Sequence, residues 1–93
     1  MGDDKRRQRR QRVLKDGRII TLDHRSVVNC MVRDLSRTGA RLKCGDQVAV
    51  PNEFLLQVGH DATMTPAKAM WRRGPDIGIV FTGEPVPAPR IYR

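Results

Sequence analysis

Two groups of residues in this 93-residue chain have the types and the spacing to bind a phosphorylated ligand. In Arg6-Arg7-Gln8-Arg9-Arg10, the first and last arginines are four residues apart. Asp34-Leu35-Ser36-Arg37-Thr38-Gly39 follows an Asp-x-Ser-x-x-Gly pattern. Arginine donates two parallel hydrogen bonds to phosphate oxygens or to O6 and N7 of guanine, and a carboxylate accepts two parallel N–H groups. Together the two groups favour recognition of phosphate and guanine.

Each group alone has a simpler interpretation. An arginine run is usually a solvated arm. Asp, Ser and Gly between two strands usually form a turn, because these residues bond the neighbouring backbone or accept unusual backbone angles. The ligand-binding interpretation rests on the occurrence of both groups in one small chain.

The composition also favours an anionic partner. Lysine and arginine number 18 against 10 aspartate and glutamate residues, which gives a net charge of +8. Fourteen of the 18 cations are arginine, the residue suited to planar, bidentate contacts with phosphate or guanine. With 39% hydrophobic and 30% charged residues, the chain supports one small domain with a lean core and excludes a multi-domain mechanism.

The chain divides into three parts by charge and apolar content. Residues 1–12 carry six cations and two anions, and Met1 is their only apolar residue. This arm cannot bury enough surface to offset its ordering entropy, so we expect it to be flexible without ligand. Residues 13–83 form the folded domain. Residues 84–93 form an extended tail, because prolines recur in it at every second position from 85 to 89.

Apolar and polar residues alternate in several short segments of the domain, which is the signature of β-strands. Turn-forming residues separate these segments, and none shows a sustained helical period. Six short strands in so few residues predict an all-β fold, a small six-stranded antiparallel β-barrel, because closure removes exposed edges. The predicted strands are 13–21, 26–34, 40–44, 54–58, 67–72 and 77–81.

Two residues in these strands carry specific expectations. Gly17 lies inside the first strand and predicts a bend or bulge there. Trp71 is in phase with Ala67 and Ala69, which predicts a core position, although it precedes two arginines and could bring its edge near a ligand. Those arginines, Arg72 and Arg73, are either phosphate contacts or solvated turn residues.

The remaining chemistry-bearing residues have simple interpretations. Cys30 and Cys44 lie in apolar segments without metal-ligand spacing and are expected to be buried free thiols, with a disulfide left open. His24 and His60 are expected at the surface, and no nucleophile motif surrounds Ser36, so we expect no metal and no catalysis. No apolar run reaches the ~20 residues of a membrane helix, which favours a cytoplasmic protein without membrane insertion.

In their order along the chain, the two groups resemble the motifs of the PilZ domain family. Arg6 and Arg10 fit its Arg-x-x-x-Arg motif, and Asp34, Ser36 and Gly39 fit its Asp/Asn-x-Ser-x-x-Gly motif. The resemblance extends from the arm to Phe81 through five short segments. These are Val13-Leu14-Lys15, Val32-Arg33-Asp34-Leu35-Ser36, Gly39-Ala40-Arg41-Leu42, Trp71-Arg72-Arg73 and Gly78-Ile79-Val80-Phe81.

The resemblance implies a six-stranded barrel that binds the bacterial second messenger cyclic di-GMP, without a cofactor. Arg6, Arg7 and Arg10 would contact phosphate and guanine as the arm folds over the ligand. Asp34 would accept from N1–H and N2–H of a guanine. Ser36 would bond a base edge or a phosphate. Gly39 would take a positive φ and allow close approach of backbone or ligand.

Two departures from the family pattern bear on these expectations. The arginine nearest the first strand is Arg12, and the residue four positions before it is Gln8, so the register of the first motif is ambiguous. The proline-rich tail supplies no C-terminal helix of the kind that many family members carry, which puts oligomerisation or docking through such a helix in doubt.

The expected function is that of an effector or adaptor whose arm changes conformation on binding cyclic di-GMP and signals to a downstream protein. Two alternatives stay open. One is a nucleic-acid-binding barrel. Two features argue against it: the chain has only four aromatic residues on which bases could stack, and the second motif contains a carboxylate, which repels phosphate. The other is a PilZ adaptor without ligand, because a fold can outlast its site.

Overall fold

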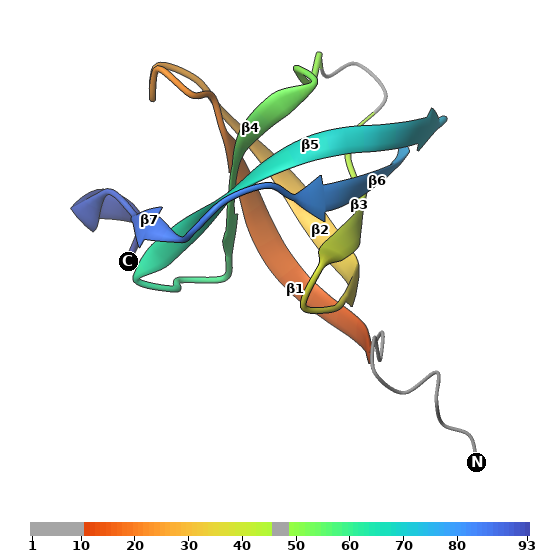
Figure 1. Cartoon of the computed structure of the whole chain (residues 1–93), viewed down its shortest axis with the longest axis horizontal. Helices are drawn as coiled ribbons and strands as arrows, with labels where there is room; N and C mark the ends of the chain where they lie inside the picture. The colour runs from red at the N-terminus through yellow and green to blue at the C-terminus, as the bar shows by residue number, and fades with distance from the viewer. Residues whose placement is uncertain (1–10, 46–48) are drawn as a thin grey trace.

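The computed structural model describes residues 11–45 and 49–93, which form seven β-strands and one turn of 3-10 helix (Figure 1). The strands are β1 (Gln11–Ile20), β2 (Val27–Leu35), β3 (Gly39–Lys43), β4 (Glu53–Val58), β5 (Thr63–Arg73), β6 (Asp76–Phe81) and β7 (Val86–Pro87). The 3-10 turn is η2 (Arg90–Tyr92).

Six of the strands close into a ring, which confirms the predicted six-stranded antiparallel barrel. Their order is β4-β1-β2-β3-β6-β5, and an additional pairing of β4 with β5 completes the circle. Each of these pairings is antiparallel. Closure satisfies the backbone hydrogen bonds that an open sheet of this size would leave at its edges.

The barrel interior is filled by the alternate residues that the period-two pattern predicts. Cys30 and Cys44 belong to this core as buried free thiols, as expected. The other buried members come from all six strands and are Ile19, Val32, Leu42, Phe54, Leu56, Ala67, Ile77 and Ile79.

The C-terminal segment covers a second apolar cluster at the other side of the barrel wall. Ile20, Leu55, Met64 and Ala88 are buried there, with Val86 and Tyr92 packed against them. β7 pairs with the first two residues of β5, so the segment lies at the end of the barrel where β5 begins (Figure 1). In the described ranges, no helix has the length and apolar character to cross a membrane.

The bulge expected at Gly17 is wrong. β1 stays in register through this glycine, which lies opposite Cys30 of β2 and Val58 of β4, and the irregularity falls instead between Arg12 and Lys15. Packing explains why glycine occupies position 17: a Cβ atom there would lie 2.9 Å from Cγ2 of Val32 and 3.1 Å from Sγ of Cys30. The glycine therefore makes room for the core side chains of the neighbouring strand.

Candidate functional site

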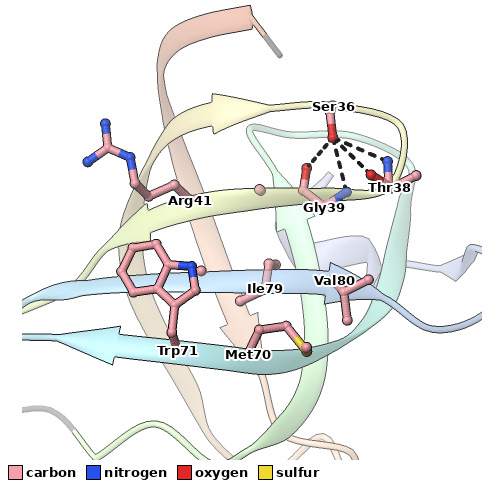
Figure 2. Close-up of a pocket in the computed structure, with 10 residues that line it drawn as sticks. Ser36, Thr38, Gly39, Arg41, Met70, Trp71, Ile79 and Val80 are labelled. Carbon is pink, nitrogen blue, oxygen red and sulfur yellow. Dashed lines mark hydrogen bonds between the residues drawn. The ribbon is translucent and has the colours of Figure 1, made fainter. Parts of the chain in front are cut away.

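The Asp-x-Ser-x-x-Gly motif forms the connection between β2 and β3. The backbone N–H of Ser36 donates to the carbonyl of Gly39 at 2.9 Å, which closes a tight turn. The Ser36 Oγ accepts from the backbone N–H groups of Thr38 and Gly39 at 3.3 and 3.2 Å (Figure 2). Local turn chemistry thus explains why serine stands at this position, and the turn places its hydroxyl at the rim of the barrel.

Gly39 begins β3, next to the backbone of β6. A Cβ atom at Gly39 would overlap the carbonyl oxygen of Ile79, so the close approach of backbone expected from the sequence is confirmed. The positive φ expected there is wrong: among the described glycines, only Gly59 and Gly74 have one. Gly39 is already part of the extended strand and pairs with Val80, so it needs the absence of a side chain and not a left-handed backbone.

Asp34 and Arg41 form an ion pair directly across β2 and β3. The Arg41 Nε donates to Oδ2 of Asp34 at 2.6 Å. Asp34 is buried with 6% of its surface exposed, whereas the side chain of Arg41 is 33% exposed. The hydrogen bond to Asp34 raises the pKa of Arg41 above its ordinary value, so the guanidinium is a permanent cation. A second carboxylate, Asp76, lies 3.8 Å from Nη1, beyond hydrogen-bond distance.

A row of directly opposed residues crosses five adjacent strands at this end of the barrel. Arg12 of β1 lies opposite Asp34 of β2, which lies opposite Arg41 of β3. Arg41 in turn lies opposite Gly78 of β6, and Gly78 lies opposite Trp71 of β5. Opposed residues in a sheet share a face. The register therefore aligns two cations, a carboxylate and an aromatic ring, with a gap at the glycine.

Register shifts create this row. One shift lies between Val32 and Asp34, and another between Ala69 and Trp71. An extra residue in one strand reverses the inside-outside alternation beyond it. Asp34 and Trp71 are in phase with core residues in the sequence, and the shifts bring both onto the outer face.

The core position expected for Trp71 is therefore wrong. Trp71 is 46% exposed and its neighbour Met70 is 62% exposed, because both oppose the single residue Gly78 at the bulge. A Cβ atom at Gly78 would overlap Nε1 and Cε2 of the indole. The ring thus lies directly over the glycine, with part of its surface open to solvent.

These residues enclose a shallow pocket of about 200 Å³. Ser36 and Thr38 of the turn bound one end, and Met70 and Trp71 of β5 line the opposite side (Figure 2). The floor consists of neighbouring residues of β3 and β6. Arg41 lies at the Trp71 end of the pocket, on the strand above the indole in Figure 2.

The structure brings three of the predicted site residues together and says nothing of the others. Asp34, Ser36 and Gly39 lie within one turn, although Asp34 reaches the pocket only through Arg41. Arg6, Arg7 and Arg10 lie outside the described residues, as do residues 1–10 of the arm that we expected over residues 1–12. The last two residues of that range, Gln11 and Arg12, belong to β1, so the expectation of a flexible arm is wrong for them.

Of the arginines left open by the sequence, Arg72 is directed away from the pocket. Its Nη2 donates to Oδ1 of Asn52 at 2.9 Å and lies 3.3 Å from the carbonyl of Pro51, which ties β5 to the loop before β4. Arg73 lies opposite Asp76 at the start of β6.

The sequence interpretation missed Arg41, Met70 and Gly78 as pocket residues, and it gave a place near the ligand only as the second possibility for Trp71. Only one signal pointed to them: Met70 and Trp71 are consecutive large apolar residues, which interrupts a strict alternation. As for metal binding, no group of three or more His, Cys, Asp or Glu side chains is gathered within residues 11–45 and 49–93.

A family model described as PilZ domain matches residues 4–90, which include both motifs, all seven strands and the start of η2. No curated protein matches the chain significantly.

Proposed function

The chain belongs to the PilZ domain family, generally a family of cyclic di-GMP-binding domains, and we propose that it binds cyclic di-GMP in the pocket beside the 36–39 turn. The observation that carries this proposal is the half-exposed indole of Trp71 in the pocket that the second motif bounds. An aromatic ring open to solvent at a motif for a purine ligand offers a surface on which a base can stack.

The ligand has two guanine bases and two phosphates, and the pocket and the row of opposed residues beside it carry groups that can bind them. The indole of Trp71 provides a stacking surface, which contributes about 1–3 kcal/mol per base in nucleic-acid complexes. Arg41 provides a guanidinium whose Nε is hydrogen-bonded to Asp34. Asp34 provides a carboxylate within the same row.

The arginines of the arm supply the remaining phosphate contacts in this proposal. β1 begins beside Asp34, because Gln11 and Arg12 lie opposite Leu35 and Asp34. The five residues back from Gln11 to Arg6 span at most roughly 17 Å when extended, so the arginine motif is within reach of the pocket. Ordering a segment on binding costs on the order of 2–5 kcal/mol, which charge-assisted hydrogen bonds of about 1.5–3 kcal/mol each can offset.

Closure of the arm over the ligand gives the domain a means of signalling. The arm before β1, residues 1–10, holds five of the 18 cations, so its ordering would change the charge pattern next to the barrel. A downstream protein that recognises the closed arm would read the presence of cyclic di-GMP. In this proposal the domain is an adaptor: it binds the ligand and a downstream protein, and it catalyses no reaction.

Trp71 also provides the test, because it is the only tryptophan in the chain. We expect cyclic di-GMP to change its fluorescence and to release heat in a calorimetric titration of the full chain. GMP and duplex DNA serve as controls. Tight binding of DNA that falls by orders of magnitude between 50 and 200 mM salt would favour the nucleic-acid alternative. Absence of heat and of a fluorescence change with cyclic di-GMP would refute the proposal.

A further inference from the structure

We infer that Cys30 and Cys44 form a modification site, at which an oxidant of the peroxide class converts the two thiols into a disulfide that joins β2 to the end of β3. Both cysteines are free thiols in the structure. The inference goes beyond the proposed function: it concerns the interior of the barrel and does not depend on whether the pocket beside the 36–39 turn binds cyclic di-GMP.

The register of β2 and β3 places the two cysteines opposite each other. Met31 lies opposite Lys43, and the two strands are antiparallel. Continuing this register by one residue brings Cys30 opposite Cys44, which directly follows the last residue of β3. Opposed residues share a face of the sheet, and both cysteines are buried in the same core cluster. The two side chains therefore enter the barrel interior side by side.

The backbone at Cys44 shows which type of pair this is. Its N–H donates to the carbonyl of Pro75, just before β6, at 2.8 Å. β6 pairs with β3 on the side away from β2, so the polar backbone groups of Cys44 do not face β2. In such a non-hydrogen-bonded pair the Cα atoms are about 4.5 Å apart. A disulfide spans Cα separations of roughly 4.4–6.8 Å, so it can close here without a large backbone movement.

The two thiols are in contact, and they differ in reactivity. A hydrogen bond between them, together with burial, raises the pKa of Cys30. The same hydrogen bond lowers the pKa of Cys44 despite its burial, and the charge of Arg72 acts in the same direction. The thiolate is the nucleophilic form of cysteine. Cys44 is therefore the thiol that reacts first, and Cys30 is the thiol that resolves the product.

The oxidation balances with hydrogen peroxide as the only other reactant. The Cys44 thiolate attacks one oxygen of the peroxide, so that an S–O bond forms, the O–O bond breaks and the departing hydroxide takes up a proton to become water. The thiol of Cys30 then attacks Sγ of Cys44, so that the S–S bond forms, the S–O bond breaks and a second water leaves. The two thiols lose two electrons and two protons, and a dithiol reductant reverses the change.

The cysteines are less enclosed than their neighbours in the core. Cys30 and Cys44 keep 8% and 6% of their surface exposed, whereas Val32 and Leu42, the inward-facing pair nearer the turn, have none exposed. Hydrogen peroxide is small and uncharged, so we expect it to reach the pair in the folded barrel.

The disulfide would close a loop over residues 30–44. This loop contains the 36–39 turn and the whole Asp-x-Ser-x-x-Gly motif. Loop closure restricts the unfolded chain, so the oxidised barrel should be more stable than the reduced one. The cross-link therefore makes the strand pair that carries the motif responsive to oxidants.

The test treats the reduced full chain with an equal concentration of hydrogen peroxide. We expect both thiols to disappear together and the intact chain to lose the mass of two hydrogens. Trypsin cuts after Arg33, so a digest without reductant should contain the peptides of Cys30 and Cys44 joined together. The urea midpoint of the oxidised chain should rise by about 1 M or more, and dithiothreitol should restore the original value.

Two controls distinguish this pair from any two cysteines in one chain. In Cys30→Ala and Cys44→Ala, which each keep one thiol, peroxide should not raise the urea midpoint. In the wild-type chain, the rate of disulfide formation should stay unchanged at low urea concentrations, below the unfolding transition. If an alanine variant fails to fold, the digest of the wild-type chain and this rate decide the question.

Four outcomes would overturn the inference. They are addition of oxygen to a thiol without a cross-link, a disulfide between two chains, a rate that rises steeply with small additions of urea, and an unchanged urea midpoint after oxidation. The third would show that only the unfolded chain is oxidised. None of these outcomes bears on the binding of cyclic di-GMP, and failure to bind cyclic di-GMP would leave this inference standing.

Discussion

Gly78 of β6 lies directly opposite Trp71 of β5, and the indole ring occupies the space where a side chain at position 78 would stand. The half-exposed orientation of the ring therefore depends on the absence of a Cβ atom on the neighbouring strand. This pair of residues determines whether the pocket has an aromatic wall.

Replacing Gly78 by alanine should displace the Trp71 indole and weaken cyclic di-GMP binding at least fivefold. Alanine would ordinarily strengthen a strand relative to glycine, by roughly 0.5–1 kcal/mol, but here its Cβ overlaps the ring. The emission maximum of Trp71 and a calorimetric titration measure the two effects. Gly83→Ala is the control, because a Cβ there meets only Pro66, at 3.4 Å. Unchanged emission in Gly78→Ala would contradict the assigned contact.

Trp71→Ala should separate binding from stability. Because the side chain is 46% exposed, its truncation should cost less than the roughly 3–5 kcal/mol of a core tryptophan, and we expect about 1 kcal/mol. Loss of the stacking surface should weaken cyclic di-GMP binding on the order of tenfold. Urea unfolding followed by circular dichroism gives the first quantity and calorimetry gives the second. For comparison, Leu42→Ala should lose about 2–5 kcal/mol, because Leu42 is fully buried. A stability loss as large in Trp71→Ala as in Leu42→Ala would restore the core interpretation.

The barrel could be predicted from the sequence because its strands keep a strict alternation over most of their length. Val32, Leu42, Phe54 and Ile77 each lie in phase with the period-two alternation of their strand, and all four are buried. Six short alternating segments in a small chain leave closure as the simplest way to bury them together. These regularities are local, so one sequence suffices to find them.

The pocket could not be predicted in the same way, because it is built where the alternation fails. A register shift is set by the pairing of two strands, and neither strand reveals it alone. For this reason the sequence predicts a core position for Trp71, which the shift between Ala69 and Trp71 overturns. Gly17 shows the converse. A glycine inside a strand is typical of a bulge, but Gly17 pairs in register, and its missing side chain makes room for Val32.

Gln57 should hold the C-terminal segment onto the barrel. This side chain is fully buried, and its amide nitrogen donates to the carbonyls of Asp61 and Tyr92 at 2.8 and 2.9 Å. Gln57→Leu removes both donors and leaves the carbonyls without these partners, at a cost of about 1–3 kcal/mol for each that stays buried. Urea unfolding measures the loss.

The same variant separates the two ends of the barrel. The C-terminal segment meets the first residues of β5, whereas Trp71 lies near the last ones. Affinity for cyclic di-GMP should therefore stay within twofold of wild type in Gln57→Leu. A loss of affinity in a folded variant would show that the C-terminal segment contributes to the site.

The thiol of Cys30 should make the barrel less stable in alkaline solution. A hydrogen bond with Cys44 and burial together raise the pKa of Cys30 above its ordinary value of about 9.0. Its protonated form is favoured in the folded state, so this contribution to stability is fully present below pH 9 and is lost as the pH rises further, where the unfolded chain releases the proton. Urea midpoints at pH 7.5 and pH 10 should differ more in the wild-type chain than in Cys30→Ala. The alanine variant is less stable at both pH values because of the cavity it leaves, so only the difference between the two midpoints bears on the thiol. Equal differences in the two proteins would mean that the thiol ionises as readily inside the barrel as in the unfolded chain.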